Sequence, residues 1–488
     1  MEKVVSLCKR RGFVFQSSEI YGGLSSCWDY GPLGVELKKN IKDFWWHRVV
    51  ISREDVVGMD AAIFMHPRVW EASGHVKHFH DPLIDCKNCK ARFREDSAIF
   101  YYRCKKCRYG FQIKDKKIIP ENEYMNKVGV QDLSGEPGHY KGGDCPWCGA
   151  KSSLHLEKLT CPECGSENLS KPRLFNLMFK TFFGPTEDSA SIVYLRPETA
   201  QGIFVNFDNV LTTSRMKLPF GIAQIGKAFR NEITTGNFIF RSREFEQMEL
   251  EFFVKLEESA KWHEYWIDDR LQWYIDMGIR AENLRLRPHE KDELAHYARA
   301  CTDIEYKFPF GWSELEGIAD RQTYDLDQHI KCSGKMLAYY ETEIKKHIVP
   351  AVVESSAGVD RTFLIAILDA YWEDAEHDRV VLRLSPKIAP IKVAVFPLVN
   401  RDGMPDIARK IYEDVKKHMS AFYDQSGSIG RRYRRQDEAG TPFCITVDSQ
   451  TLEDQTVTIR DRDTLKQIRV SMEKIVETIK NAIDKGSL

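Results

Sequence analysis

A run of charged and polar side chains interrupts a segment that otherwise has the spacing of a buried β-strand. Residues 240–253 read FRSREFEQMELEFF and follow a short loop after Ala228–Glu232. Successive side chains of a strand point to opposite faces, so alternate residues should share a surface. Those expected together are Arg241, Arg243, Phe245, Gln247 and Glu249. Guanidinium groups suit phosphate, an aromatic ring suits a base and a carboxylate suits a cation, so the hairpin is predicted to bind a nucleotide. An amphipathic hairpin with a solvated polar face is the alternative.

Composition sets broad limits. A chain of 488 residues with 42% hydrophobic content can hold two or three domains. Its net charge of -1 means that any nucleic acid must be bound through local basic patches. The N-terminus carries Glu2 and a Lys-Arg-Arg cluster where a signal peptide would need apolar residues, and apolar runs are short. We therefore expect a cytoplasmic protein without membrane association.

Eight of the thirteen cysteines fall in four Cys-x-x-Cys pairs, a spacing that lets one tight turn present two thiolates to a tetrahedral Zn²⁺. Two structural four-sulfur sites are predicted. Sequence neighbours can form two successive sites, or the outer pairs can enclose an inner site. Free thiols and a thiol-disulfide role are the alternatives. The pairs are Cys86/Cys89, Cys104/Cys107, Cys145/Cys148 and Cys161/Cys164.

A second phosphate-binding element is predicted near Gly358. A strand-like run at 348–353 leads into small residues, and a helix then starts with Arg361 in its first turn. The free N–H groups of a helix start and a guanidinium both favour an anion. The alternative is an arginine paired with Asp360 or Glu354.

Other segments give the outline of the chain. Helices are expected over 31–50, entered through Pro32, over 257–275 and over 361–372. After Pro390 a separate α/β domain is expected, with strands at 391–398, 443–447 and 456–460 and helices at 406–422 and 464–483.

These features together resemble a known family. Arg230 and Glu232 look like motif 2 of the class II aminoacyl-tRNA synthetases, and residues 358–361 look like motif 3. Five further runs, at 30–34, 70–75, 194–204, 312–321 and 430–442, resemble the dimeric type of glycyl-tRNA synthetase. The resemblance spans nearly the whole chain except the cysteine-rich stretch.

The resemblance implies an α+β fold: an antiparallel catalytic sheet of six or seven strands flanked by helices, a zinc-binding insertion and a C-terminal α/β anticodon-binding domain. The expected division is 1–85 and 174–390 for the catalytic domain, 86–173 for the insertion and 391–488 for the anticodon-binding domain. It also implies a homodimer built around the helix near Gly31. Shorter relatives carry only the outer four cysteines, which favours the nested zinc arrangement.

The implied reaction uses ATP with Mg²⁺, glycine and tRNA. Glycine would attack the α-phosphate of ATP to give glycyl-adenylate, and a terminal ribose hydroxyl of tRNA would then accept the glycyl group. Catalysis would rest on positioning and charge stabilisation. Rejecting any larger amino acid is sterically easy, so no editing site is expected.

The resemblance assigns roles to the residues of this chain that occupy the matching positions of the family's motifs. Arg230 is expected on the α-phosphate, Arg361 on the γ-phosphate and Phe245 on adenine, with Glu314 helping to hold Mg²⁺. The ATP site is completed by Asn231, Glu232, Phe240, Arg241, Leu315 and Gly358, of which Glu232 is counted with Arg230 and Arg361 as catalytic. The glycine site is expected from Glu198, Gln247, Glu249, Glu354 and Ser356, with Arg94 and Arg321 nearby. For each acid, a structural ion pair is the alternative.

The basic run 431–435, with Tyr433 among four arginines, suits phosphate contact and base stacking. Its alternatives are a solvated face or pairing with Asp437 and Glu438. Ser355 departs from the family, whose members often have proline there, and is expected to loosen the turn before Gly358. An accessory subunit without catalysis, and a synthetase for threonine or proline, are the competing functions.

Overall fold

The computed structural model describes residues 1–114, 117–120, 144–145, 147–185, 191–233, 236–295 and 297–488. The chain divides into two compact units, each with its own interior. The first contains residues 1–65, 198–229 and 236–488, and the second contains residues 66–197 and 230–235.

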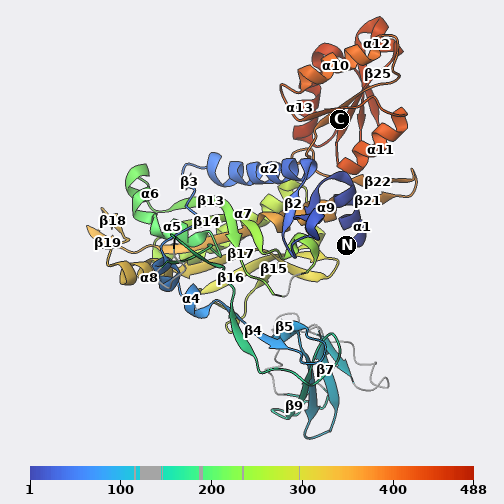
Figure 1. The fold of residues 1–488 in the computed structure, drawn as a ribbon. Coiled ribbons are helices and arrows are strands. Elements are labelled where there is room, and N and C mark those ends of the chain that lie inside the picture. Colours follow the sequence, from blue (N-terminus) through green and yellow to red (C-terminus); the bar gives the residue numbers. More distant parts are fainter. Residues whose placement is uncertain (115–116, 121–143, 146, 186–190, 234–235, 296) are drawn as a thin grey trace. The chain divides into compact units, whose positions relative to one another are not determined.

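A seven-stranded sheet forms the centre of the first unit (Figure 1). Six strands are antiparallel, and edge strand β3 runs parallel to β13. The sheet was expected to have six or seven antiparallel strands, and β3 is the exception. In spatial order the strands are β15 (Leu284–Pro288), β16 (Ala300–Phe308), β17 (Gly311–Gln322), β20 (Ala351–Gly358), β14 (Glu244–Val254), β13 (Phe220–Phe229) and β3 (Val56–Gly58).

Apolar side chains cover both faces of this sheet. On one face, Leu250 and Phe252 of β14 pack with helices α2, α7 and α9 in the largest core. On the other face, Phe253 packs with Phe204 of α5 in a smaller core. Polar residues of β14 that share the side of Phe253 therefore lie beside α5. The α-helices in this part of the first unit are α1 (Glu2–Arg11), α2 (Pro32–Trp46), α5 (Ala200–Val205), α6 (Phe207–Ser214), α7 (Ser259–Met277), α8 (Tyr324–Ser333) and α9 (Val359–Ala370).

Several helices begin or end at residues that favour a boundary, and the predicted entry of a helix through Pro32 is confirmed. Pro32 stands in the first turn of α2, and Gly278 and Gly334 end α7 and α8 in the left-handed conformation that glycine adopts most easily. Small hairpins and short helices complete this part. They are β1 (Val14–Gln16), β2 (Trp28–Tyr30), β18 (Tyr339–Glu341), β19 (Lys346–Ile348), β21 (Tyr371–Asp374), β22 (Arg379–Leu382), η1 (Glu19–Tyr21), η2 (His47–Ile51), η5 (Phe238–Phe240), η6 (Leu256–Glu258) and η7 (Ala281–Asn283).

The C-terminal part of the first unit has its own five-stranded sheet and core. Two predicted helices are wrong in extent. The segment predicted as helix 406–422 ends its helix at Val415 and continues as β24, and the first half of 464–483 forms β27, which pairs with β26. The elements are β23 (Val393–Pro397), α10 (Met404–Val415), β24 (Ala421–Tyr423), α11 (Ile429–Ala439), β25 (Phe443–Val447), α12 (Ser449–Asp454), β26 (Thr456–Asp461), β27 (Gln467–Ser471), η8 (Met472–Lys474) and α13 (Ile475–Lys485).

The second unit is built from short strands around the cysteine pairs. A four-stranded sheet and a three-stranded sheet pack around Phe93, Phe100 and Phe111. Its elements are α3 (Pro67–Ala72), α4 (His75–His78), β4 (His80–Asp85), β5 (Arg92–Arg94), η3 (Glu95–Ser97), β6 (Ile99–Cys104), β7 (Gly110–Lys114), β8 (Lys117–Pro120), β9 (Leu154–Thr160), β10 (Arg173–Asn176), β11 (Lys180–Phe182) and β12 (Ile192–Tyr194).

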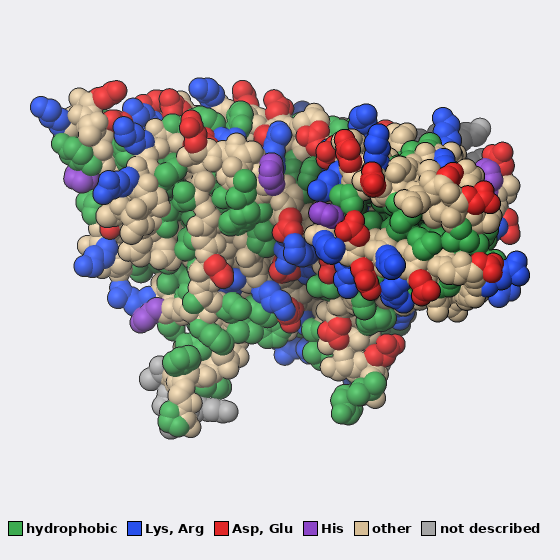
Figure 2. All heavy atoms as spheres, turned by 90° about the horizontal axis from the view of Figure 1, so that it is seen from above, with side chains coloured by type: hydrophobic (Ala, Val, Ile, Leu, Met, Phe, Trp, Pro, Cys, Tyr) green, Lys and Arg blue, Asp and Glu red, His purple; other side chains and the backbone are tan. Residues whose placement is uncertain are grey.

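Charges of both signs are interspersed over the face of the molecule in Figure 2. This distribution agrees with the net charge of -1. Among the described residues, no helix is long and apolar enough to span a bilayer.

Candidate active site and cysteine centres

Three carboxylates meet at the middle of the seven-stranded sheet, on the face that carries α5. Strand pairing places Glu249 opposite Ser356 and Glu251 opposite Glu354. Oxygens of Glu249, Glu251 and Glu354 lie within 4.8 Å of one another, and all three side chains are buried. Burial, and next the charge of Glu354, raise the pKa of Glu249 to about 8. The same two causes raise the pKa of Glu251 well above its usual value. Such a cluster favours a cation, because a positive group would relieve the repulsion.

Arg321 neutralises one edge of this acid cluster. Its Nη1 donates to Glu354 Oε2 at 2.6 Å, and its Nε and Nη2 donate to Asp325 at 2.7 and 2.8 Å. The guanidinium carbon lies 4.0 Å from the ring centre of Tyr297. Arg321 is therefore fixed by a bidentate carboxylate and an aromatic face.

The start of α5 supplies the next contacts. Thr199 Oγ1 donates to Glu249 Oε2 at 2.7 Å, and Thr199 N donates to Gln247 Oε1 at 3.2 Å. Gln247 Nε2 in turn donates to Ser356 Oγ at 3.2 Å. Gln201 Nε2 donates to Glu198 Oε1 at 2.9 Å, and the charge of Glu198 acts on both Glu249 and Glu354. Six of the seven residues predicted around glycine thus converge in the first unit.

Arg361 lies in the first turn of α9, as the sequence predicted. Its Nε donates to Phe240 O at 3.3 Å and its Nη1 to Glu314 O at 3.0 Å, while its guanidinium carbon is 4.5 Å from the centre of the Phe240 ring. An ion pair of 3.3 Å joins Arg361 to the Glu314 carboxylate. Three predicted ATP-site residues are therefore brought together.

The carboxylates considered as alternative partners of Arg361 are occupied elsewhere. Asp360 accepts from the hydroxyl of Tyr30, from Lys38 Nζ at 2.9 Å and from the backbone N–H of Glu246 at 2.8 Å. Glu354 pairs with Arg321, as described above. The alternative prediction, that Arg361 pairs with Asp360 or Glu354, is therefore wrong.

The predicted ledge of five side chains is only partly correct. Strand β14 begins at Glu244, and the chain before it turns through positive φ angles at Asn237 and Phe238. Arg241 and Arg243 therefore lie in the connection, and Arg243 Nη1 donates to Ser25 O at 3.1 Å. Phe245, Gln247 and Glu249 share one face of β14 as expected.

Two further residues predicted for the ATP site, Leu315 and Gly358, have no side chain available to a ligand. The side chain of Leu315 is buried in the main core, so its backbone is the part that can meet a nucleotide. Gly358 ends β20 directly before α9, and a Cβ atom there would lie 3.5 Å from Cγ of Arg361.

Four predicted site residues belong to the second unit. Arg230 Nε donates to Pro197 O at 3.1 Å, and its guanidinium carbon is 5.3 Å from the centre of the Phe79 ring. Asn231 N donates to Leu177 O at 2.7 Å, and Glu232 N donates to Arg230 O at 2.7 Å. Arg94 pairs with Asp96 at 2.9 Å and with Asp81 at 3.4 Å. Their convergence with Arg361 and the acid cluster stays a prediction.

The sequence pattern left four polar residues of this site unidentified. Glu251 has the same strand parity as Gln247 and Glu249, so alternation could have found it. Thr199 and Gln201 lie within the quoted run 194–204. Asp325 follows a bulge near Asp320, and no local pattern marks it.

Ser355 stands on the opposite face from Ser356. It lies inside β20 and donates from Oγ to Glu316 Oε1 at 2.6 Å, while Glu316 pairs with Arg270 at 2.7 Å in the core. The expected loosening of the turn before Gly358 is therefore wrong: Ser355 is a buried partner of an ion pair.

The eight paired cysteines form two groups in the nested arrangement. Cys86, Cys89, Cys161 and Cys164 make the outer group, and Cys104, Cys107, Cys145 and Cys148 make the inner one. Sulfur atoms from different pairs are 3.6 Å apart in the outer group and 3.7 and 3.8 Å apart in the inner group. Tetrahedral Zn²⁺ with Zn–S bonds of about 2.3 Å requires about 3.8 Å between sulfurs, so both groups fit the ion.

All four pairs fold into the same turn. The residue after the second cysteine adopts a positive φ, and its N–H donates to the carbonyl of the first cysteine at 2.9 to 3.0 Å. Glycine meets this requirement in two turns, at Gly149 and Gly165. The other two turns place Lys90 and Arg108 at this position, where a side chain with a Cβ atom makes the positive φ less favourable in free energy than it is for glycine.

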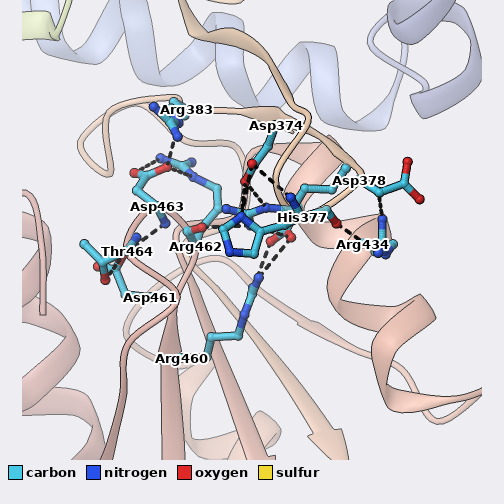
Figure 3. A network of polar contacts seen from close by, with 12 residues as sticks. Asp374, His377, Asp378, Arg383, Arg434, Arg460, Asp461, Arg462, Asp463 and Thr464 are labelled. Atoms are coloured by element: carbon cyan, nitrogen blue, oxygen red, sulfur yellow. Dashed lines mark hydrogen bonds and ion pairs between the residues drawn. The ribbon is translucent and has the colours of Figure 1, made fainter.

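The basic run of α11 is largely structural. Arg432 is buried and donates from Nη1 to Pro397 O at 2.6 Å, and Arg435 pairs with Asp424 at 2.5 Å. Arg434 donates to the backbone carbonyls of Asp378 and His377 (Figure 3). The alternative prediction, that these arginines pair with Asp437 and Glu438, is wrong. Asp437 pairs with Arg379 and Arg460, and Glu438 pairs with Arg10 and Arg11.

Comparison with known proteins agrees with this architecture. Residues 183–371 match the family described as the tRNA synthetase class II core domain (G, H, P, S and T), and residues 392–482 match the anticodon binding domain. The glycine–tRNA ligase of Caldanaerobacter subterraneus is 53% identical over 477 residues, covering 97% of this chain and 96% of the relative. Those of Treponema denticola and Acetivibrio thermocellus are 49% and 50% identical over 491 and 487 residues, covering 99% of this chain and 97% and 98% of the relatives.

An antiparallel sheet with this core match, joined to an anticodon-binding domain, defines a class II aminoacyl-tRNA synthetase. Sequence identity near 50% to glycine–tRNA ligases, over almost the full length, identifies the family within this class. The chain belongs to the glycine–tRNA ligase family and is an enzyme.

Proposed function

We propose that this chain attaches glycine to tRNA in two steps. The carboxylate of glycine attacks the α-phosphorus of ATP, and pyrophosphate leaves to give glycyl-adenylate. A terminal ribose hydroxyl of the tRNA then attacks the acyl carbon, and AMP leaves. The observation that carries this proposal is the buried cluster of Glu249, Glu251 and Glu354 beside Arg321, on the same sheet from which α9 presents Arg361.

Glycine has no side chain to grip, so its two charges must provide the affinity. The ammonium group would be held by Glu249 and Glu354 with help from Glu198, where a positive charge relieves the repulsion that raises the pKa of Glu249 to about 8. Gln247 and Ser356 are placed to hydrogen-bond at the same point, and Arg321 lies at the edge. Crowding by these side chains would exclude a larger amino acid.

The triphosphate of ATP would lie along Arg361 and Arg230, on its γ- and α-phosphates, with adenine stacked on Phe245. Asn231, Glu232, Phe240, Arg241, Leu315 and Gly358 would complete the pocket, and Arg94 would lie near the glycine. Glu314 offers a carboxylate to Mg²⁺, which when bound shields the charge of the phosphates. The proposal is supported by the ion pair of 3.3 Å between that carboxylate and Arg361, which puts Glu314 beside the residue assigned to the γ-phosphate.

The other parts of the chain have supporting roles in this proposal. Each four-cysteine group would hold a structural Zn²⁺, which fits the spacing of its sulfurs. Residues 391–488 would bind the anticodon, residues 86–173 would form the insertion, and residues 1–85 and 174–390 would form the catalytic domain. We further infer a homodimer around α2 and a cytoplasmic location, where the cysteines, none of which forms a disulfide among the described residues, would stay reduced.

Glycine-dependent exchange between ATP and pyrophosphate tests the first step without tRNA. The wild-type chain should exchange with glycine and not with threonine or proline. Replacing Arg361 with alanine should abolish exchange while leaving the fold intact, because the γ-phosphate loses its cation. No exchange by the wild type would favour an accessory subunit, and an active, folded Arg361→Ala variant would refute the role of that residue.

A further inference from the structure

The inner cysteine group carries a feature that holding a metal does not require. Trp147 lies at the tip of the turn between Cys145 and Cys148, and 43% of its surface is exposed. Its ring stacks on Tyr109, with centroids 5.3 Å apart and 20° between the planes. Tyr109 stacks in turn on buried Phe111 at 5.9 Å. A large ring is thus held rigidly at the surface by rings that continue into the core.

Basic residues lie on the turn that faces Trp147 across the four-sulfur group. Lys105, Lys106 and Arg108 belong to the facing turn of the same four-sulfur group, and all are exposed. Within residues 99–114, 144–145 and 147–160, seven Lys or Arg residues face two Asp or Glu residues. Both acids have partners: Glu157 accepts from Arg103 Nε at 2.5 Å and Asp144 from Ser152 N at 2.8 Å. Lys158 pairs with Glu167 at 3.1 Å, so the positive charge rests mainly on the exposed Lys105, Lys106 and Arg108, although the whole chain has a net charge of -1.

The outer group provides an internal comparison. Its turn at 161–165 has the same Cys-Pro-x-Cys-Gly sequence as the turn at 145–149. In both, the glycine has a positive φ and its N–H donates to the carbonyl of the first cysteine. The position of Trp147 is taken there by Glu163. The exposed aromatic residue is therefore no requirement of this turn or of metal binding.

We propose that Trp147 and the adjoining lysines form an RNA-binding surface that contacts tRNA outside the catalytic sheet. A rigid aromatic face accepts any unpaired base, and cations beside it neutralise the backbone phosphates. Both contacts are needed for single-stranded nucleic acid, and an acidic peptide would leave the ring unused. This surface rests on the proposed function only in its choice of tRNA as the RNA.

The test separates the two half-reactions in the full-length enzyme. Trp147→Ala and the double variant Lys105→Ala, Lys106→Ala are compared with Glu163→Ala and Lys87→Ala, the matched changes in the outer group. All four should keep glycine-dependent ATP–pyrophosphate exchange within about twofold, since that step needs no tRNA. The inner variants should weaken tRNA binding and raise the KM for tRNA by about tenfold, and the outer variants should not.

Filter binding of tRNA at several salt concentrations adds a second readout. For the double lysine variant, the slope of log Kd against log salt should fall by about 0.7 for each phosphate that the lysines no longer neutralise. If the Trp147→Ala variant loses its metal, the double lysine variant alone tests the proposal, because Lys105 and Lys106 are exposed. Wild-type affinity and salt slope in the inner variants would overturn the proposal, as would equal losses in the outer ones. Failure of exchange in the wild type would instead overturn the proposed function.

Discussion

At the scale of single residues, the site is defined by which face of a strand a side chain occupies. Glu249 and Ser356 project toward the face that carries α5, whereas Ser355, one residue away, supports the buried pair of Arg270 and Glu316. Chemically similar neighbours therefore have separable roles, and substitutions can distinguish them.

Glu249 should make the protein less stable as pH rises. Its pKa is about 8 in the folded chain against an ordinary 4.5, so folding takes up a proton between these values. Stability should fall from about pH 4.5 upward, with the loss complete above about 8. Glu249→Gln stays neutral, so urea unfolding at pH 8.5 should show a gain of roughly 1–3 kcal/mol, together with loss of exchange.

Glu246 is the matched control on the opposite face of β14. Although burial would raise its pKa, Lys38 holds that pKa below the usual value. Glu246→Gln should therefore lose stability at neutral pH. Equal stabilities of Glu249→Gln and the wild type at pH 8.5 would contradict the repulsion inferred for the acid cluster.

The two serines of β20 should respond in opposite ways. Ser355→Ala should cost about 1–3 kcal/mol in urea unfolding, because Glu316 loses a buried hydrogen bond, and should leave exchange kinetics unchanged. Ser356→Ala should raise the KM for glycine with little change in stability. A raised KM for glycine in Ser355→Ala would show that the two faces are coupled.

Sequence reasoning found residues whose chemistry is unusual for their place, such as Glu249 in a strand and Arg361 in a helix start. Of the residues it assigned to glycine, Arg321 is fixed by Asp325 only four positions later. The two lie in different elements, β17 and α8, so neither strand alternation nor helix spacing relates them. Thr199, which donates to Glu249, is 50 positions away from it. Partners brought together by a change of element or by tertiary folding were therefore the ones that the sequence could not supply.

At the scale of elements, the regular spacing of apolar residues predicted the long helices correctly, whereas short strands were missed. Helices α2, α7 and α9 lie where apolar spacing placed them. Residues 467–471 looked helical because apolar residues follow in α13, but they pair with β26 instead. Tertiary pairing overrides local preference in so short a segment.

The nested cysteine arrangement makes a distinct prediction for metal content. The wild type should bind two Zn²⁺ ions per chain. Serine at Cys104, Cys107, Cys145 and Cys148 together should leave one ion, because the outer four-sulfur group stays complete. Mass spectrometry under native conditions or metal analysis measures the content. A chain without zinc after this fourfold change would indicate that sequence neighbours pair.

At the scale of the whole molecule, a buried ion network joins the β21–β22 hairpin to the C-terminal part (Figure 3). Arg379 of β22 donates to Asp374 at 2.8 Å and to Asp437 of α11 at 2.9 Å, and Arg460 pairs with Asp437 at 2.8 Å. Arg462 donates to the carbonyl of Leu384 at 2.8 Å. None of these links was predicted: Asp374 and Arg379 lie on the two strands of one short hairpin, and the other links join residues 23 or more positions apart in the sequence.

Asp437 is shared by two buried arginines, so removing it should leave both without their common carboxylate. Asp437→Ala should cost about 3–5 kcal/mol, which differential scanning calorimetry would detect as earlier unfolding of the C-terminal part. Because residues 391–488 are proposed to bind the anticodon, charging of tRNA should fall well below wild type while exchange stays near it. Lys3→Ala breaks an exposed pair with Glu373 and should cost less than about 1 kcal/mol. Equal losses of charging and exchange in Asp437→Ala would show that this network supports the catalytic sheet instead of the placement of the anticodon-binding part.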